Sequence, residues 1–67
     1  MTLQQMPSGS WYGSRQGKAA VIRQAGDGTW QIKMCDPSDR NAGHDGWVLV
    51  GVGYENAAVA TAETGVT

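Results

Sequence analysis

The residues with chemistry to offer gather in the stretch CDPSDRNAGHDG, between Cys35 and Gly46. His44 and Asp45 are the one pair that resembles a general base with an orienting carboxylate. The candidate nucleophiles are Cys35 and Ser38, but neither stands in a motif that would activate it. The pattern therefore predicts that the chain is not an enzyme and has no catalytic residue.

Oxygen-bearing side chains in the same stretch raise the question of a metal site. Asp39, Asn41 and Asp45 could supply oxygen ligands to calcium. Gly43 stands where a calcium loop needs another oxygen ligand, and no glutamate follows at the spacing of the bidentate ligand. One cysteine and one histidine are too few for structural zinc. We therefore expect no metal and no cofactor.

The elements that must position any site are organised around a β-hairpin predicted over residues 18–35. Its second strand, residues 29–35, alternates apolar and polar residues with the period of two of a half-buried strand. A three-residue loop, Gly26-Asp27-Gly28, matches the apolar residues of the two strands, whereas a two-residue turn would set Arg23 against the core. The predicted pairs are Ala25–Thr29, Gln24–Trp30, Arg23–Gln31, Ile22–Ile32, Val21–Lys33 and Ala20–Met34. Gly28 would then adopt the left-handed backbone conformation.

The remaining elements are a further strand and a helix. Gly46–Gly53 is the most apolar run and predicts the central strand of the sheet. Glu55–Glu63 is rich in alanine, with Asn56 as a cap and Gly65 as a stop, which predicts a short helix. Residues 10–14 are expected to form a short strand or a loop. At least two of the three tryptophans should lie in the core: Trp11, Trp30 and Trp47.

These elements predict an α+β fold, a three-stranded antiparallel sheet with one short C-terminal helix packed on it. In the alternative, residues 57–61 form another strand and the chain is a small all-β SH3-like barrel. Residues 1–9 are expected to be a flexible N-terminal segment, residues 10–64 a single small domain and residues 65–67 a frayed tail.

Charge is distributed unevenly along the chain, although the formal net charge is only −1. Residues 1–35 hold four cations against one acid, a local +3, whereas residues 36–67 hold one cation against five acids, a local −4. There is no apolar run of membrane-spanning length and no signal-peptide pattern. We therefore expect no membrane partner and a cytoplasmic location, with which the single Cys35 agrees.

Our first functional hypothesis is a small non-enzymatic binding module that binds nucleic acid through the basic hairpin. The open face of the predicted sheet would carry Arg23, Gln31 and Lys33. Small sheet-plus-helix domains at the ends of integrases lay such a face into the major groove of DNA, so the hypothesis rests partly on fold-level analogy. The candidate contacts to phosphates and bases are Arg15, Lys18, Arg23, Gln24, Gln31 and Lys33.

The alternative is a protein-binding regulator or inhibitor, or a subunit that assembles with copies of itself. This hypothesis explains the weak net charge better, because aromatic residues and arginine anchor protein interfaces. The candidate interface residues are Trp11, Tyr12, Val21 and Arg40. Small chains without catalytic residues are common in phages and other mobile elements, which makes a phage or other mobile element our expected source on frequency alone.

Overall fold

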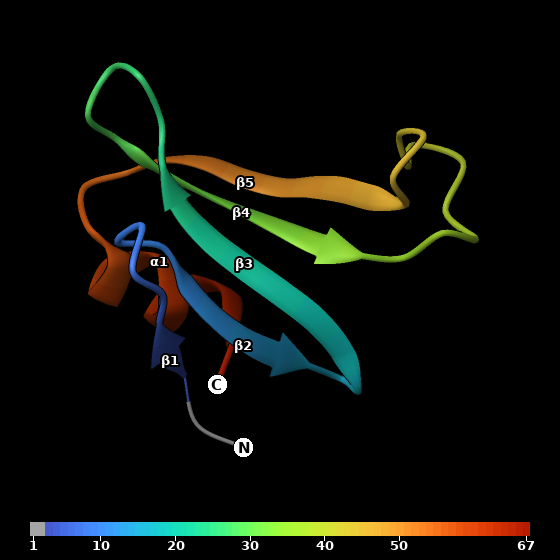
Figure 1. Cartoon of the computed structure of the whole chain (residues 1–67), viewed down its shortest axis with the longest axis horizontal. Coiled ribbons are helices and arrows are strands. Elements are labelled where there is room, and N and C mark those ends of the chain that lie inside the picture. The colour runs from blue at the N-terminus through green and yellow to red at the C-terminus, as the bar shows by residue number, and fades with distance from the viewer. Residues whose placement is uncertain (1–2) are drawn as a thin grey trace.

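The computed structural model describes residues 3–67 and contains, within them, five strands followed by one helix (Figure 1). Each strand pairs antiparallel with the next along the chain, so the sheet order is β1-β2-β3-β4-β5. The helix packs against β3, β4 and β5. The elements are β1 (Gln4–Gln5), β2 (Trp11–Arg15), β3 (Lys18–Gln24), β4 (Trp30–Cys35), β5 (Trp47–Tyr54) and α1 (Ala57–Thr64).

The predicted hairpin and its register are confirmed in β3 and β4. Ile22 lies opposite Ile32 and Arg23 lies opposite Gln31, and the other predicted ladder pairs also hold. The Ala25 N–H donates to the Thr29 carbonyl at 2.7 Å, which closes a three-residue loop. Gly28 has a φ of 90°, the left-handed conformation that the loop requires.

The same turn occurs three times among residues 3–67: it closes the β1–β2 and β3–β4 hairpins and forms the end of the β4–β5 loop. In each, the residue before the loop donates its N–H to the carbonyl four positions later, and a left-handed glycine donates back at 2.9–3.1 Å. Asp27 and Asp45 each accept a hydrogen bond from the backbone N–H two residues later, a contact that fixes the turn. The three turns are Met6–Ser10, Ala25–Thr29 and Gly43–Trp47.

Alternation along the strands separates the sheet into two faces. The inner face packs on α1 and carries a small aliphatic core, against which Trp11 and Trp30 are partly buried. No tryptophan belongs to the fully buried set within residues 3–67, so Trp11 and Trp30 border the core rather than fill it, and Trp47 lies outside it. The buried core residues are Ala20, Ile22, Ile32, Met34, Ala60 and Val66.

The terminal helix forms with the caps that the sequence predicts. The Asn56 side chain accepts a hydrogen bond from the Val59 N–H at 2.9 Å, which satisfies one free donor of the first turn. Gly65 ends the helix in the left-handed conformation, with its N–H donating to the Thr61 carbonyl. Ala60 is fully buried, and its small side chain lets the helix lie close to the sheet.

The prediction of a three-stranded sheet is wrong, because β1 and β2 add two strands to it. The prediction that Gly46–Gly53 is the central strand is also wrong, since β5 lies at the edge of the sheet. Three of its apolar side chains, Leu49, Val50 and Val52, are exposed instead of covered, Val52 to 61%. The barrel alternative fails because residues 57–61 belong to α1. A sheet combined with one helix remains compatible with the α+β class.

The two ends of the chain meet along the free edge of β2 (Figure 1). β1 pairs with the first half of β2, and Thr67 exchanges two backbone hydrogen bonds with Ser14. A side chain at Gly13 would come within 2.6 Å of both Leu3 and Thr67, so only glycine allows this approach. These contacts fall in the segments 1–9 and 65–67, whose flexibility stays a prediction. Residues 1 and 2 lie outside the described residues.

The hairpin loop offers a test of its backbone geometry. We predict that Gly28→Ala lowers the free energy of unfolding by about 1–2 kcal/mol, because an L-residue is strained at positive φ. A β-carbon there meets no atom within 4 Å, so the cost comes from the backbone alone. Urea denaturation measures this change in the free energy of unfolding. Gly26→Ala is the matched control, since its β-carbon is equally free and its φ is not positive. Equal stability of the two variants would contradict the turn assignment.

Candidate functional site

The face of the sheet opposite α1, called the outer face below, mixes apolar and basic side chains. Its central row runs across four strands from Tyr12 through Val21 and Lys33 to Leu49. Tyr12 and Leu49, at the two ends of this row, are exposed to 41% and 52%. Trp47, opposite Cys35, lies on the same face. The outer face therefore presents aromatic and aliphatic surface to the surroundings.

Three of the six predicted nucleic-acid contacts are adjacent on this face. Arg23 lies directly opposite Gln31, and Lys33 follows Gln31 two residues later on β4. Arg23 and Lys33 are thus diagonal neighbours, which in an antiparallel pair places their Cα atoms about 7–8 Å apart. Arg23 is exposed, whereas Gln31 and Lys33 are half-buried. Within residues 3–67, the side chains of Arg23 and Lys33 form no hydrogen bond and no ion pair.

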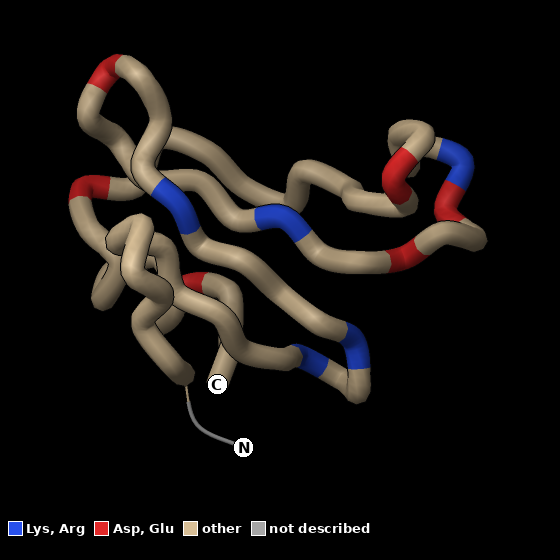
Figure 2. Tube along the Cα trace, in the orientation of Figure 1, with Lys and Arg blue, Asp and Glu red and all other residues tan. Residues whose placement is uncertain are grey.

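The strands that carry this pair contain no acidic residue, and Asp45 of the β4–β5 loop is the acidic residue that shares a hollow with Arg23 and Lys33. None of the five strands contains Asp or Glu, and all six acidic residues lie in loops, in a turn or in the helix (Figure 2). Three of them are in the loop between β4 and β5, which extends from one end of the sheet. The two cations of the outer face are therefore available to an anionic partner.

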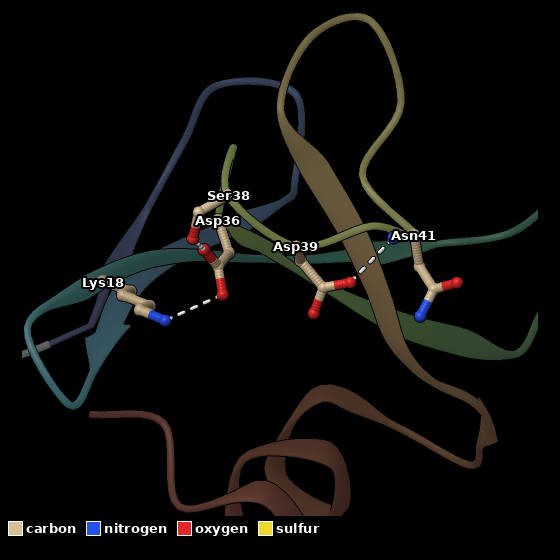
Figure 3. Close-up of polar contacts among 5 residues, drawn as sticks. All are labelled: Lys18, Asp36, Ser38, Asp39 and Asn41. Carbon is tan, nitrogen blue, oxygen red and sulfur yellow. Dashed lines mark hydrogen bonds and ion pairs between the residues drawn. The ribbon is translucent and has the colours of Figure 1, made fainter.

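Arg15 and Lys18 do not join this group. They pair with each other at the end of the β2–β3 hairpin, in register with the inner face. There they line a hollow of about 190 Å³ together with Asp36 and Asp39. Lys18 donates to Asp36 Oδ2 at 2.8 Å, in the one ion pair among the described residues (Figure 3). These cations face carboxylates and point away from the outer face.

The Lys18–Asp36 contact is part of a small polar network at the end of β4. Ser38 Oγ donates to Asp36 Oδ1 at 2.8 Å (Figure 3). The hydrogen bond from Lys18, followed by that from Ser38, lowers the pKa of the Asp36 carboxyl below its ordinary value of 3.8. In the same loop the Asn41 N–H donates to Asp39 Oδ1, so both carboxylates serve to order the loop.

The remaining predicted contact, Gln24, is also separated from the cations of the outer face. Its register partner is Trp30, an inner-face residue. Its amide nitrogen donates to the Gly28 carbonyl at 3.0 Å, which ties the side chain to its own hairpin loop. The sheet thus divides the predicted set into Arg23, Gln31 and Lys33 on one side and Arg15, Lys18 and Gln24 on the other.

The four residues of the alternative protein interface are likewise dispersed. Tyr12 and Val21 are neighbours on the outer face. Trp11 packs against the core on the inner face, and Arg40 is exposed in the β4–β5 loop. Sequence reasoning missed the exposed apolar residues of β5, because it placed that strand in the middle of the sheet. The sequence contains no second strongly apolar strand that could pair with the free edge of β5, and this could have indicated that β5 lies at the edge of the sheet.

The residues considered for catalysis or metal binding have structural roles in their loop. Asp45 Oδ1 accepts the Trp47 N–H at 3.0 Å as part of the turn, and no hydrogen bond joins Asp45 to His44. His44 is exposed and Cys35 is half-buried. In the described part of the chain no three potential ligands among His, Cys, Asp and Glu are grouped to hold a metal ion. The expectation that the chain is not an enzyme stays a prediction.

Comparisons with known proteins provide no relative. The chain matches no protein-family model, and no curated protein or solved structure is significantly similar to it. Across residues 3–67, the helix is too short to cross a membrane.

The network at Lys18 predicts a change in the titration of one carboxyl. Lys18→Met removes the largest cause of the low Asp36 pKa, so this pKa should rise toward 3.8. Because the folded pKa is depressed, the carboxylate stabilises the fold above about pH 3.8, and this contribution is lost as the pH falls through the folded pKa. In Lys18→Met the loss should be smaller.

Carboxyl-carbon NMR titration of the wild type and the variant measures both values. Asp27 is the internal control, because its pKa is lowered by hydrogen bonds from Thr29 and not by a cation. Its titration should be the same in both proteins. An unchanged Asp36 pKa would show that the ion pair does not form in solution.

Proposed function

We propose that the chain is a small non-enzymatic binding module that binds nucleic acid through the outer face of its sheet. The observation that carries the proposal is the position of Arg23 and Lys33. They are diagonal neighbours on a sheet whose strands contain no acidic residue, and neither is engaged in an ion pair within residues 3–67. Cations that form no ion pair attract phosphates, and in the described part of the chain Asp45 is the one residue of the acidic loop that shares a hollow with them.

The division of labour on this face follows from side-chain chemistry. The guanidinium of Arg23 and the ammonium of Lys33 would contact phosphates. Gln31, which is beside Lys33 on β4 and opposite Arg23, would reach base edges through its amide. Arg15 and Lys18 have a smaller part in this proposal, because they lie beside Asp36 and Asp39 on the other face. The cytoplasm would be the place of action, since the single Cys35 suits a reducing compartment.

A second candidate function is assembly with a second copy through β5. This edge strand has eight residues, none of them charged, so two copies aligned antiparallel would meet no like charges. Leu49 and Val52 are the most exposed large apolar residues of the described chain. The register of β5 shifts twice along β4, and such bulges make the edge less regular. For this reason self-assembly ranks second.

The leading proposal predicts different effects for two double variants of equal charge change. Arg23→Ala with Lys33→Ala should weaken binding to mixed-sequence DNA at low salt at least about tenfold, because two charge-assisted contacts are lost. The slope of log affinity against log salt should fall by about 2. Arg15→Ala with Lys18→Ala should bind nearly as the wild type does. Gel mobility shifts measure both. Equal weakening of the two variants would mean that net charge, and not the outer face, controls binding.

The second candidate predicts a change in molecular mass. If β5 pairs with itself, the wild type should be a dimer by light scattering at micromolar concentration, and Val52→Lys should be a monomer because it places a charge in the interface. Val59→Lys, on the exposed side of α1, is the control and should leave the mass unchanged. A monomeric wild type would rule this candidate out.

A further inference from the structure

Two hollows adjoin at Arg23: the first opens at the edge of the sheet, where residues of both faces line it, and the second lies on the outer face. Both are lined by Val21 and Arg23, so they meet at these two residues. Each also has a tryptophan in its lining: Trp30, which reaches the first from the inner face, and Trp47, which lies on the outer face, in the second. A cation between two aromatic side chains is the combination that proteins use to bind single-stranded nucleic acid, in which bases stack on aromatic rings while the backbone follows positive charge.

The first hollow exists because β2 begins too late to cover the end of β3. Trp11 pairs with Ile22, so Arg23 and Gln24 extend beyond the β2 ladder, beside the Met6–Ser10 turn. The hollow measures about 480 Å³, within the range of roughly 300–1,000 Å³ of small-ligand sites. Its walls offer two hydroxyls, an amide, a guanidinium and an indole, from Ser8, Ser10, Gln24, Arg23 and Trp30. These groups can hydrogen-bond to a base or a phosphate and contact a base ring.

The second hollow is smaller and has a different charge. It measures about 160 Å³, and its lining includes Lys33, Asp45 and Trp47. One oxygen of Asp45 accepts the Trp47 N–H, and no hydrogen bond to its other oxygen is found in residues 3–67. That carboxylate repels a phosphate but can accept a hydrogen bond from a base amino group. The second hollow is therefore suited to a base, with the phosphate beside Arg23.

The small number of cations on the outer face indicates which form of nucleic acid, duplex or single strand, is the better ligand. Two phosphate contacts give a log–log salt slope of only about −1.8 on duplex DNA, so attraction to phosphates alone leaves binding weak. Stacking on an aromatic side chain is worth about a 5- to 150-fold gain in affinity per base. Bases in a duplex are stacked on one another and cannot enter the hollows, whereas those of a single strand can be splayed apart. Binding through the hollows thus favours a single strand.

We propose that the preferred ligand is single-stranded nucleic acid, with two neighbouring bases in the two hollows and the phosphate between them on Arg23. This inference rests on the proposed function and narrows it. The first test compares the wild-type protein with a fluorescently labelled single-stranded oligonucleotide and with its duplex, by anisotropy at low salt. The single strand should bind at least about tenfold tighter. This comparison depends on no variant.

The second test uses substitutions at Trp47, which is not part of the buried core cluster. Trp47→Leu should weaken single-strand binding by about 5- to 150-fold and leave duplex binding unchanged, since it removes the ring and retains an apolar side chain. Trp47→Tyr should restore most of the affinity. Tyr12→Leu is the matched control, because Tyr12 is exposed on the same face and lines neither hollow. Circular dichroism checks that each variant is folded.

The outcomes separate the inference from the proposed function. A single-strand preference that Trp47→Leu removes and Tyr12→Leu leaves intact supports the inference. Equal binding of duplex and single strand overturns the inference, while the proposed function stands. A Trp47→Leu variant that binds the single strand as the wild type does, or no more weakly than Tyr12→Leu, also overturns it. Absence of binding to either nucleic acid at low salt overturns both.

Discussion

The pairing of β3 with β4 is the constraint on which the rest of the structure depends. Side chains alternate between the two faces of a sheet, so a shift of one residue in this register would exchange every side chain between the core and the outer face. The Ala25–Thr29 hydrogen bond and left-handed Gly28 set the register. They bring Ile22 against Ile32 in the core, and the same geometry places Arg23 beside Gln31 on the opposite face.

This register also separates the basic residues into two groups with different surroundings. Lys18 is paired with Asp36 at the end of the inner face, where it orders the start of the β4–β5 loop. Arg23 and Lys33 have no such partner in the described part of the chain. A net charge of −1 therefore hides a small surface of unpaired positive charge, bordered by Tyr12 and Trp47. Local arrangement, and not total charge, supports the proposed role.

The parts of the fold that could be predicted are those that local sequence decides. The loop Gly26-Asp27-Gly28 and the caps Asn56 and Gly65 have strong conformational preferences, and their elements form as expected. The first hairpin was missed although its turn, which contains Ser8-Gly9, closes in the same way. Strand order depends on contacts distant in sequence, which no local pattern contains, so the edge position of β5 was not foreseen. The same limit applies to Arg15 of the candidate site, because only the β2–β3 register reveals that it belongs to the inner face. Alternation along β3 could have placed Lys18 there, since it lies two residues before Ala20.

We propose that the outer face, through Arg23 and Lys33, is the binding surface. Amide chemical shifts recorded by NMR during titration with a single-stranded oligonucleotide test it most directly, because they report every strand at once. We predict shifts concentrated at Val21, Arg23, Lys33 and Trp47, with Arg15, Lys18 and the helix unaffected. Shifts centred on Arg15 and Lys18, or no shifts at low salt, would contradict it.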